Sequence, residues 1–297
     1  MALNFKGTNL ILDNFRTILR DYSIDVQDVV RSAILDDVDV ADYIEICKSN
    51  PYRLDQIRLC KKEGVNDEAV YSIKNGDSIY KLRQLIQKGT DIDAILQQLH
   101  QGTLNDYSIH KMISWVLSGY DLKGINLSII PNSLFEVFEQ GFQKGFDMRV
   151  YNNGKNYNPE YLRYCMIIQF NKKDVKPFVD KIWKVDCIKQ LAVLSKGISA
   201  DKWDTFISKL NCSISSEKLS VLISCVKNGI GIDKLVSDDW SCDAIRIVLL
   251  AFKDNMNYTK LVTVGPDVDT VTALYNEMKL SKMKKLGGRL SGRLDRK

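Results

Sequence analysis

Side chains that commonly carry chemistry are few and scattered in this chain of 297 residues. The two histidines, His100 and His110, lie on opposite sides of Gly102 without a neighbouring cysteine or acid pair at the spacing of a zinc site. The sequence contains no nucleophile elbow of the Gly-x-Ser-x-Gly type, no phosphate-binding glycine loop, no dinucleotide fingerprint and no His-Glu-x-x-His motif. We therefore expect a protein that is not an enzyme and that uses neither a cofactor nor a metal.

The cysteines and the acid pairs also favour structural roles. The seven cysteines include no Cys-x-x-Cys pair, and an odd number cannot all pair within one chain, so we expect reduced thiols that pack in the core. Asp36-Asp37 and Asp238-Asp239 lack the spacing of an EF-hand calcium loop, and such pairs are typical of solvated helix ends. Neither group of residues predicts a catalytic site.

Basic residues are concentrated at the C-terminus. Residues 279–297 contain eight Lys/Arg and one acid, which leaves 34 basic and 36 acidic residues in the rest of the chain. The segment 281–297 combines these bases with glycines and has no aromatic residue, so we expect a flexible tail. Flexible basic tails bind nucleic acid through counterion release or become ordered on an acidic protein. The candidate binding residues of this tail are Lys282, Lys284, Lys285, Arg289, Arg293 and Arg296.

The elements that would position these residues follow an internal repeat. A small residue that readily takes the left-handed backbone conformation closes an apolar segment every 25 to 32 residues. These closing residues are Gly64, Gly89, Gly119, Gly145, Asn171, Gly197, Gly229 and Asn255. Two positions after most of them stands a residue favoured at a helix N-cap, which predicts that one helix ends and another begins within about three residues.

Apolar residues recur ten, seven and three positions before most closing residues, with Gln190 and Lys61 as exceptions, which is the spacing of one face of an α-helix. Each repeat should therefore contain an amphipathic helix of about three turns, followed by a short helix or turn. Eight positions before the closing residue, four repeats carry a base, and these bases would form a broken stripe if the helices stack in register. The four bases are Lys81, Lys111, Arg163 and Lys189.

A repeat of about 26 residues cannot bury its apolar face alone, but stacked repeats can share one core. We therefore predict an all-α protein, an α-solenoid of eight to ten short helix-turn-helix repeats. It would form a single domain over 1–280, with a helical N-terminal cap over 1–24, repeats over about 25–280 and the basic tail over 281–297. Residues 151–159 give the strongest loop signal in the chain.

The sequence also bears on the compartment. No apolar run reaches the eighteen or so residues that a membrane-spanning helix requires, so we expect no membrane partner. The first residues lack the basic stretch, apolar core and cleavage site of a secretion signal. We expect a cytoplasmic protein.

Two stretches, 55–66 and 81–91, resemble a short helical repeat of uncharacterised bacterial proteins, many of which are encoded on mobile elements. Those proteins repeat an apolar-Arg helix that ends in a Lys/Glu-Gly step followed by Asp. Here Arg58 and Arg83 supply the arginine, whereas later repeats keep only the apolar spacing. The resemblance implies a helical-repeat fold and a mobile-element origin, and it carries no activity and no site residues. In the later repeats the arginine position is occupied by Ile113, Glu139, Cys165, Leu191, Ile223 and Leu249.

Two hypotheses for function follow from these patterns. The first is a non-enzymatic scaffold that binds a protein partner along its repeats, as an inhibitor or adaptor encoded on a mobile element. The second is a nucleic-acid-associated protein that uses the stripe and the basic tail to hold a phosphate backbone. The two differ in their dependence on salt, because phosphate contacts weaken steeply as salt rises.

Overall fold

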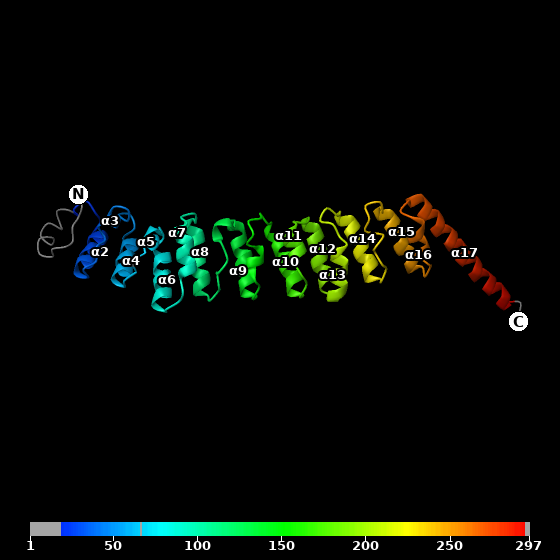
Figure 1. Cartoon of the computed structure of the whole chain (residues 1–297), viewed down its shortest axis with the longest axis horizontal. Helices are drawn as coiled ribbons and strands as arrows, with labels where there is room; N and C mark the ends of the chain where they lie inside the picture. The colour runs from blue at the N-terminus through cyan, green and yellow to red at the C-terminus, as the bar shows by residue number, and fades with distance from the viewer. Residues whose placement is uncertain (1–18, 66, 295–297) are drawn as a thin grey trace. The chain divides into compact units, whose positions relative to one another are not determined.

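The computed structural model describes residues 19–65 and 67–294, with side chains up to residue 284. Within these ranges every regular element is an α-helix or a short 3-10 helix, so the prediction of an all-α protein is confirmed. The chain, whose helices are labelled in Figure 1, divides into two compact units, residues 1–156 and 157–297. The boundary falls inside the predicted loop 151–159, and the single helical-repeat domain over 1–280 stays a prediction. Most of the expected cap, residues 1–18, lies outside the described residues.

In unit 1, long helices alternate with short elements. Its α-helices are α2 (Ile24–Leu35), α3 (Ala41–Ile44), α4 (Pro51–Lys62), α5 (Glu68–Ser72), α6 (Gly76–Gln87), α7 (Asp93–His100), α8 (Asp106–Leu117) and α9 (Phe135–Gln143). Three 3-10 helices complete it: η1 (Leu127–Ile129), η2 (Asn132–Leu134) and η3 (Met148–Tyr151). Helix α4 packs against α2 and α6, α6 packs against α8, and the short helices α5 and α7 pack against each other.

Unit 2 shows the same alternation over most of its length. Its helices are α10 (Pro159–Phe170), α11 (Lys176–Asp180), α12 (Val185–Ser195), α13 (Ala200–Ser208), α14 (Ser216–Lys227), α15 (Cys242–Lys253), α16 (Thr259–Val264) and α17 (Val268–Leu294). Helix α12 packs between α10 and α14, and α15 packs between α14 and α17. In both units the long helices that are consecutive along the chain are therefore neighbours in space.

Side-chain caps explain where many of the helices begin. Asn50, Asn75 and Asn105 accept hydrogen bonds from backbone N–H groups in the first turns of α4, α6 and α8. Ser215 and Ser241 do the same for α14 and α15. These short polar side chains satisfy amide donors that the first helical turn leaves without an intrahelical acceptor.

Six of the eight closing residues have a positive φ, as the predicted helix ends require. At the fifth repeat the left-handed residue is Lys172, one position after the expected Asn171. Asn171 instead remains at the helix end, where its amide donates to the carbonyl of Ile167 and to the hydroxyl of Ser195. Gly197 is not left-handed, because only a short turn separates α12 from α13.

The core of each unit lies between the long helices and the short elements. All eight residues predicted ten positions before a closing residue are buried, as are most of those seven positions before it. In unit 1, the ring of Trp115 on α8 packs against Phe135 and Phe142 of α9, with centroids 5.4 and 5.1 Å apart. In unit 2, Phe178 on α11 packs edge to face against Trp183 and Trp203. Aromatic packing therefore connects successive repeats.

The C-terminal segment differs from the expected flexible tail. Helix α17 continues through residues 281–294, so the backbone there is helical and not irregular. Lysine, arginine and leucine are all good helix formers, and they continue a helix that starts against α15 and α16. Residues 295–297 lie outside the described part of the chain.

Candidate partner-binding surfaces

The arginines of the repeat motif are clamps between helices. Arg83 of α6 donates from Nε to Glu63 Oε2 at 2.9 Å and from Nη1 to Gln56 Oε1 at 2.7 Å, both in the preceding repeat. Arg58 of α4 pairs in the same way with Asp36, which follows α2. Glu63 stands one position before Gly64, and Asp36 stands one position before Asp37, which also has a positive φ, so one register rule generates both ion pairs. The motif that carries the family resemblance therefore has a structural role in this chain.

The first two bases of the predicted stripe are also used within unit 1. Lys81 Nζ lies 3.3 Å from both Ser114 Oγ and His110 Nε2 of α8. Lys111 Nζ lies 2.8 Å from Glu139 Oε2 of α9. Both lysines are half-buried and bridge neighbouring helices, so they do not form the free cationic stripe that we predicted.

The other two bases of the stripe are exposed on neighbouring helices of unit 2. Arg163 on α10 and Lys189 on α12 have no ion-pair partner among the described residues. Phe170 lies two turns after Arg163 and is 70% exposed, and Val193 lies one turn after Lys189 and is 61% exposed. Exposed apolar side chains beside unpaired bases are typical of a protein-binding surface more than of a phosphate track.

The candidate residues of the tail lie on α17 as far as the structure describes them. Lys282 and Lys284 are exposed, and the ammonium of Lys282 donates to the carbonyl of Asp254. Lys285, Arg289 and Arg293 lie on the helical backbone, and their side chains are outside the described set, as is the whole of Arg296. Leu280 and Met283 are each 61% exposed on the same helix.

The two histidines, His100 and His110, have different surroundings and do not form a common site. His110 lies between α6 and α8, where burial and the nearby ammonium of Lys81 lower the pKa of its imidazole. His100 is exposed, with its Nε2 3.1 Å from Asp67 Oδ2. The described residues include no group of three or more His, Cys, Asp or Glu side chains that could hold a metal ion.

The cysteines are free thiols in the described structure. Five of the seven are buried, and burial raises the pKa of Cys60 and of Cys165 to about 12 and that of Cys225 to about 11. A thiol with so high a pKa is protonated at neutral pH and is a poor nucleophile. These positions agree with the predicted packing role.

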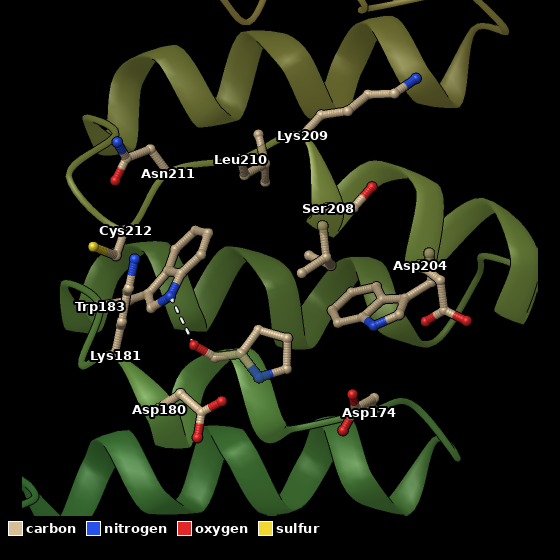
Figure 2. Close-up of a pocket in the computed structure, with 13 residues that line it drawn as sticks. Asp174, Asp180, Lys181, Trp183, Asp204, Ser208, Lys209, Leu210, Asn211 and Cys212 are labelled. Atoms are coloured by element: carbon tan, nitrogen blue, oxygen red, sulfur yellow. Dashed lines mark hydrogen bonds between the residues drawn. The ribbon is translucent and has the colours of Figure 1, made fainter.

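One hollow of unit 2 lies beside the short helices α11 and α13 (Figure 2). It has a volume of about 610 Å³ and is formed by α11, α13 and the segments that follow them. Its apolar lining is Pro177, Trp183, Trp203, Ile207 and Leu210. We call this hollow the tryptophan pocket.

Charged side chains stand around the tryptophan pocket. In the view of Figure 2, Asp174 and Asp204 lie at one end, and Lys181 and Cys212 lie at the other. The ammonium of Lys209 forms an ion pair with Asp233, outside the pocket lining. The end of the tryptophan pocket that holds Asp174 and Asp204 therefore carries negative charge, and neither acid has an ion-pair partner among the described residues.

Two further hollows continue from the tryptophan pocket along unit 2. One, of about 360 Å³, lies between α13 and residues 229–233, and the other, of about 520 Å³, lies between residues 209–218 and 236–242. Lys209 lines all three hollows. Together they form a groove, mainly apolar in the first two hollows and more polar in the third, which we call the short-element groove.

Sequence reasoning missed this groove. Trp183, Trp203 and Trp240 are the signal that could have indicated it, because each follows a long helix of unit 2 and each lines one of the hollows. Tryptophan is enriched at the centres of protein interfaces, where it supplies a large apolar body and one hydrogen-bond donor.

Comparison with models of protein families, with curated proteins and with solved structures finds no match to this chain. The resemblance to the short bacterial helical repeat therefore stays a prediction. None of the described helices is both long enough and apolar enough to cross a membrane.

Proposed function

We propose that the protein is a non-enzymatic helical-repeat scaffold whose short-element groove in unit 2 binds a segment of a protein partner. The observation that carries this proposal is the row of three hollows that share Lys209, two of which are lined by tryptophans. Successive repeats place equivalent hollows side by side, which suits an extended ligand that crosses several repeats. Hollows that are mainly apolar, with a few polar groups, are typical of binding sites.

The solenoid arrangement is part of this proposal. Its support is the neighbour relation within each unit, where the helices α2, α4, α6 and α8 pack in succession, as do α10, α12, α14, α15 and α17. A mobile-element origin and a role as an inhibitor or adaptor remain proposals that rest on the resemblance of residues 55–66 and 81–91 alone.

The alternative proposal is nucleic-acid binding by the basic end of α17. It is supported by exposed Lys279 and Lys284 and by the helical backbone that carries Lys285, Arg289 and Arg293. The bases of the stripe give less support to this alternative, because Lys81 already bonds to Ser114 and Lys111 to Glu139.

The test is cross-linking capture from native lysate with the tagged full chain, followed by mass spectrometry and absorbance at the nucleic-acid band. Each capture is run with and without nuclease and at two salt concentrations. Ser208→Trp places a bulky ring at the rim of the tryptophan pocket, and Ser220→Trp, on the exposed face of α14, is the matched control. A version that ends at Leu280 removes the basic end of α17.

If the protein is a scaffold that uses the groove, the full chain should still capture one protein partner after nuclease treatment. The Ser220→Trp control and the version that ends at Leu280 should capture the same partner, and Ser208→Trp should lose it. If Ser208→Trp captures the partner as well as the wild type does, the groove is excluded as the binding site. Bound material that disappears with nuclease and with truncation would instead support the alternative, because nucleic-acid binding depends on the bases and falls steeply with salt.

A further inference from the structure

The tryptophan pocket is lined by an indole donor that has no acceptor. Trp203 is only 1% exposed and lines the pocket, and among the described residues its indole N–H has no hydrogen-bond acceptor. The other tryptophan of the pocket differs, because Trp183 Nε1 donates to the carbonyl of Pro177 at 3.3 Å (Figure 2). The indole N–H of Trp203 is therefore available to an acceptor on a ligand.

Two exposed acids at the same site can bind a cation. Asp174 and Asp204 line the pocket, and no lysine or arginine of the described residues lies within ion-pair distance of either. One oxygen of Asp174 accepts from the backbone N–H of Lys176, and its other oxygen remains available. Two carboxylates beside an apolar wall favour a ligand cation that has its own apolar stem.

Together these groups describe one ligand chemistry. An arginine side chain has a three-carbon stem and a planar guanidinium that two carboxylates can bind, and the peptide backbone beside it offers a carbonyl acceptor. The volume of about 610 Å³ exceeds that of a single side chain, which leaves room for the adjoining backbone.

We propose that the tryptophan pocket binds an arginine residue of an extended peptide. The guanidinium lies at the end of Asp174 and Asp204, the stem lies on the apolar lining, and a backbone carbonyl accepts from Trp203 Nε1. This inference rests on the proposed function, since it names the kind of segment that the groove takes. At the opposite end in Figure 2, Lys181 stands with Asp180, so the net negative charge of the pocket is at the end of Asp174 and Asp204.

The test uses the full chain labelled with ¹⁵N at its four tryptophans, whose indole signals are resolved by NMR. The probe is N-acetyl-arginine methylamide, and the comparison probe is the citrulline analogue, which has the same shape without the charge. Trp203→Phe assigns the Trp203 signal. Small fragments of this size bind in the millimolar range at best, so the titration extends to about 50 mM.

The arginine probe should shift the Trp203 signal saturably, and the citrulline probe should bind at least about fivefold more weakly. Asp174→Asn combined with Asp204→Asn should weaken the arginine probe by a similar factor. Asp201→Asn, which removes a carboxylate of α13 outside this pocket, is the matched control and should have no effect.

Equal binding of the two probes, or an equal loss in the Asp201→Asn control, would overturn the inference. So would the absence of a Trp203 shift at 50 mM. The proposed function fails separately, because it predicts that Ser208→Trp loses a protein partner whether or not that partner presents an arginine.

Discussion

At the scale of single residues, buried polar side chains connect one repeat to the next. Arg53 donates from Nε to the carbonyl of Ile73 and from Nη2 to that of Tyr71, at 2.8 and 3.0 Å. Gln98 accepts from the backbone N–H of Leu127 and donates to the carbonyl of Ile125. These groups satisfy backbone atoms at the ends of short elements, where helical hydrogen bonds stop.

The pair of Arg83 and Glu63 makes stability depend on pH. The hydrogen bond from Arg83 lowers the pKa of the Glu63 carboxyl below its usual range of about 4.3. Because the folded-state pKa is the lower one, the pair stabilises the fold above about pH 5 and loses this effect as pH falls through the folded pKa. We expect Glu63→Gln to be less stable than the wild type at pH 7 and to approach it at pH 3.5.

Urea unfolding at the two pH values measures this difference. Glu68→Gln, an exposed position on α5 without an ion pair in the described structure, is the control and should change little at either pH. A Glu63→Gln deficit that is equally large at both pH values would contradict the role of the ion pair.

The cysteines give a second prediction at this scale. Cys212 and Cys242 are partly exposed, whereas the other five are buried, and burial raises the pKa of Cys60, Cys165 and Cys225. A thiol reagent should therefore label at most Cys212 and Cys242 rapidly in the native protein, and all seven after denaturation. Mass spectrometry of the labelled peptides counts them. Rapid native labelling of Cys60 or Cys165 would mean that this core opens readily.

At the scale of elements, the short helices depend on the long helices for their position. Helix α11 has only five residues and would not be stable alone. The Tyr161 hydroxyl of α10 donates to the carbonyl of Phe178 at 2.8 Å and accepts from the backbone N–H of Trp183 at 3.2 Å. One buried hydroxyl thus positions the end of α11 and the tryptophan that follows it.

Removing that hydroxyl should destabilise unit 2 and disturb the tryptophan pocket. Tyr161→Phe leaves one backbone donor and one acceptor without a partner, at a cost of about 1–3 kcal/mol. Tyr164→Phe, whose hydroxyl bonds to exposed Glu160 on the same helix, should cost less than about 0.5 kcal/mol. Urea unfolding gives both values, and the indole signal of Trp183 should move only in Tyr161→Phe. Equal costs for the two variants would contradict this account.

Helix α9 contains a glycine that packing requires. A Cβ atom built on Gly141 would lie 2.1 Å from the sulfur of Met148, which is itself buried. Alanine normally stabilises a helix interior by up to about 1 kcal/mol relative to glycine, whereas overpacking costs about 1–3 kcal/mol. We expect the clash to dominate, so that Gly141→Ala lowers the free energy of unfolding.

A double-mutant cycle with Met148→Ala tests the cause. In the Met148→Ala background the added methyl group has room, and Gly141→Ala should become neutral or stabilising, with a coupling above about 0.5 kcal/mol. A stabilising effect of Gly141→Ala in the wild-type background would show that Met148 moves aside at no cost.

At the scale of the whole molecule, the chain consists of two compact units joined at residues 156 and 157. Each contains its own buried aromatic cluster, around Trp115 in unit 1 and around Phe178 in unit 2. A compact unit with its own core can in principle fold alone. The tryptophan pocket and the short-element groove belong to unit 2.

We therefore predict that fragments 1–156 and 157–297 are each helical and each unfold cooperatively. Circular dichroism during thermal and urea unfolding provides the measurement, and fragments cut at 130, inside unit 1, serve as the control that should not fold properly. A fragment of either unit without a cooperative transition would show that the two units depend on each other for folding.

The sequence by itself determined the helices of this protein. Caps such as Asn75 and Ser241, left-handed residues such as Gly89 and the apolar spacing act within one or two turns, so helix ends and buried faces could be read locally. The same local information correctly indicated the packing role of the cysteines. It failed at Gly197 and at residues 281–294, where either a helix or an irregular segment fits the composition.

Only the tertiary structure decided which charges are used and where the candidate site lies. Lys81 and Arg163 occupy the same position of the repeat, yet Lys81 contacts α8 and Arg163 is exposed. The tryptophan pocket joins Asp174 to Asp204 and Trp183 to Trp203, pairs that are twenty residues or more apart. Such contacts depend on how successive helices stack, and this depends on the shapes of packed side chains and not on the preference of any single residue.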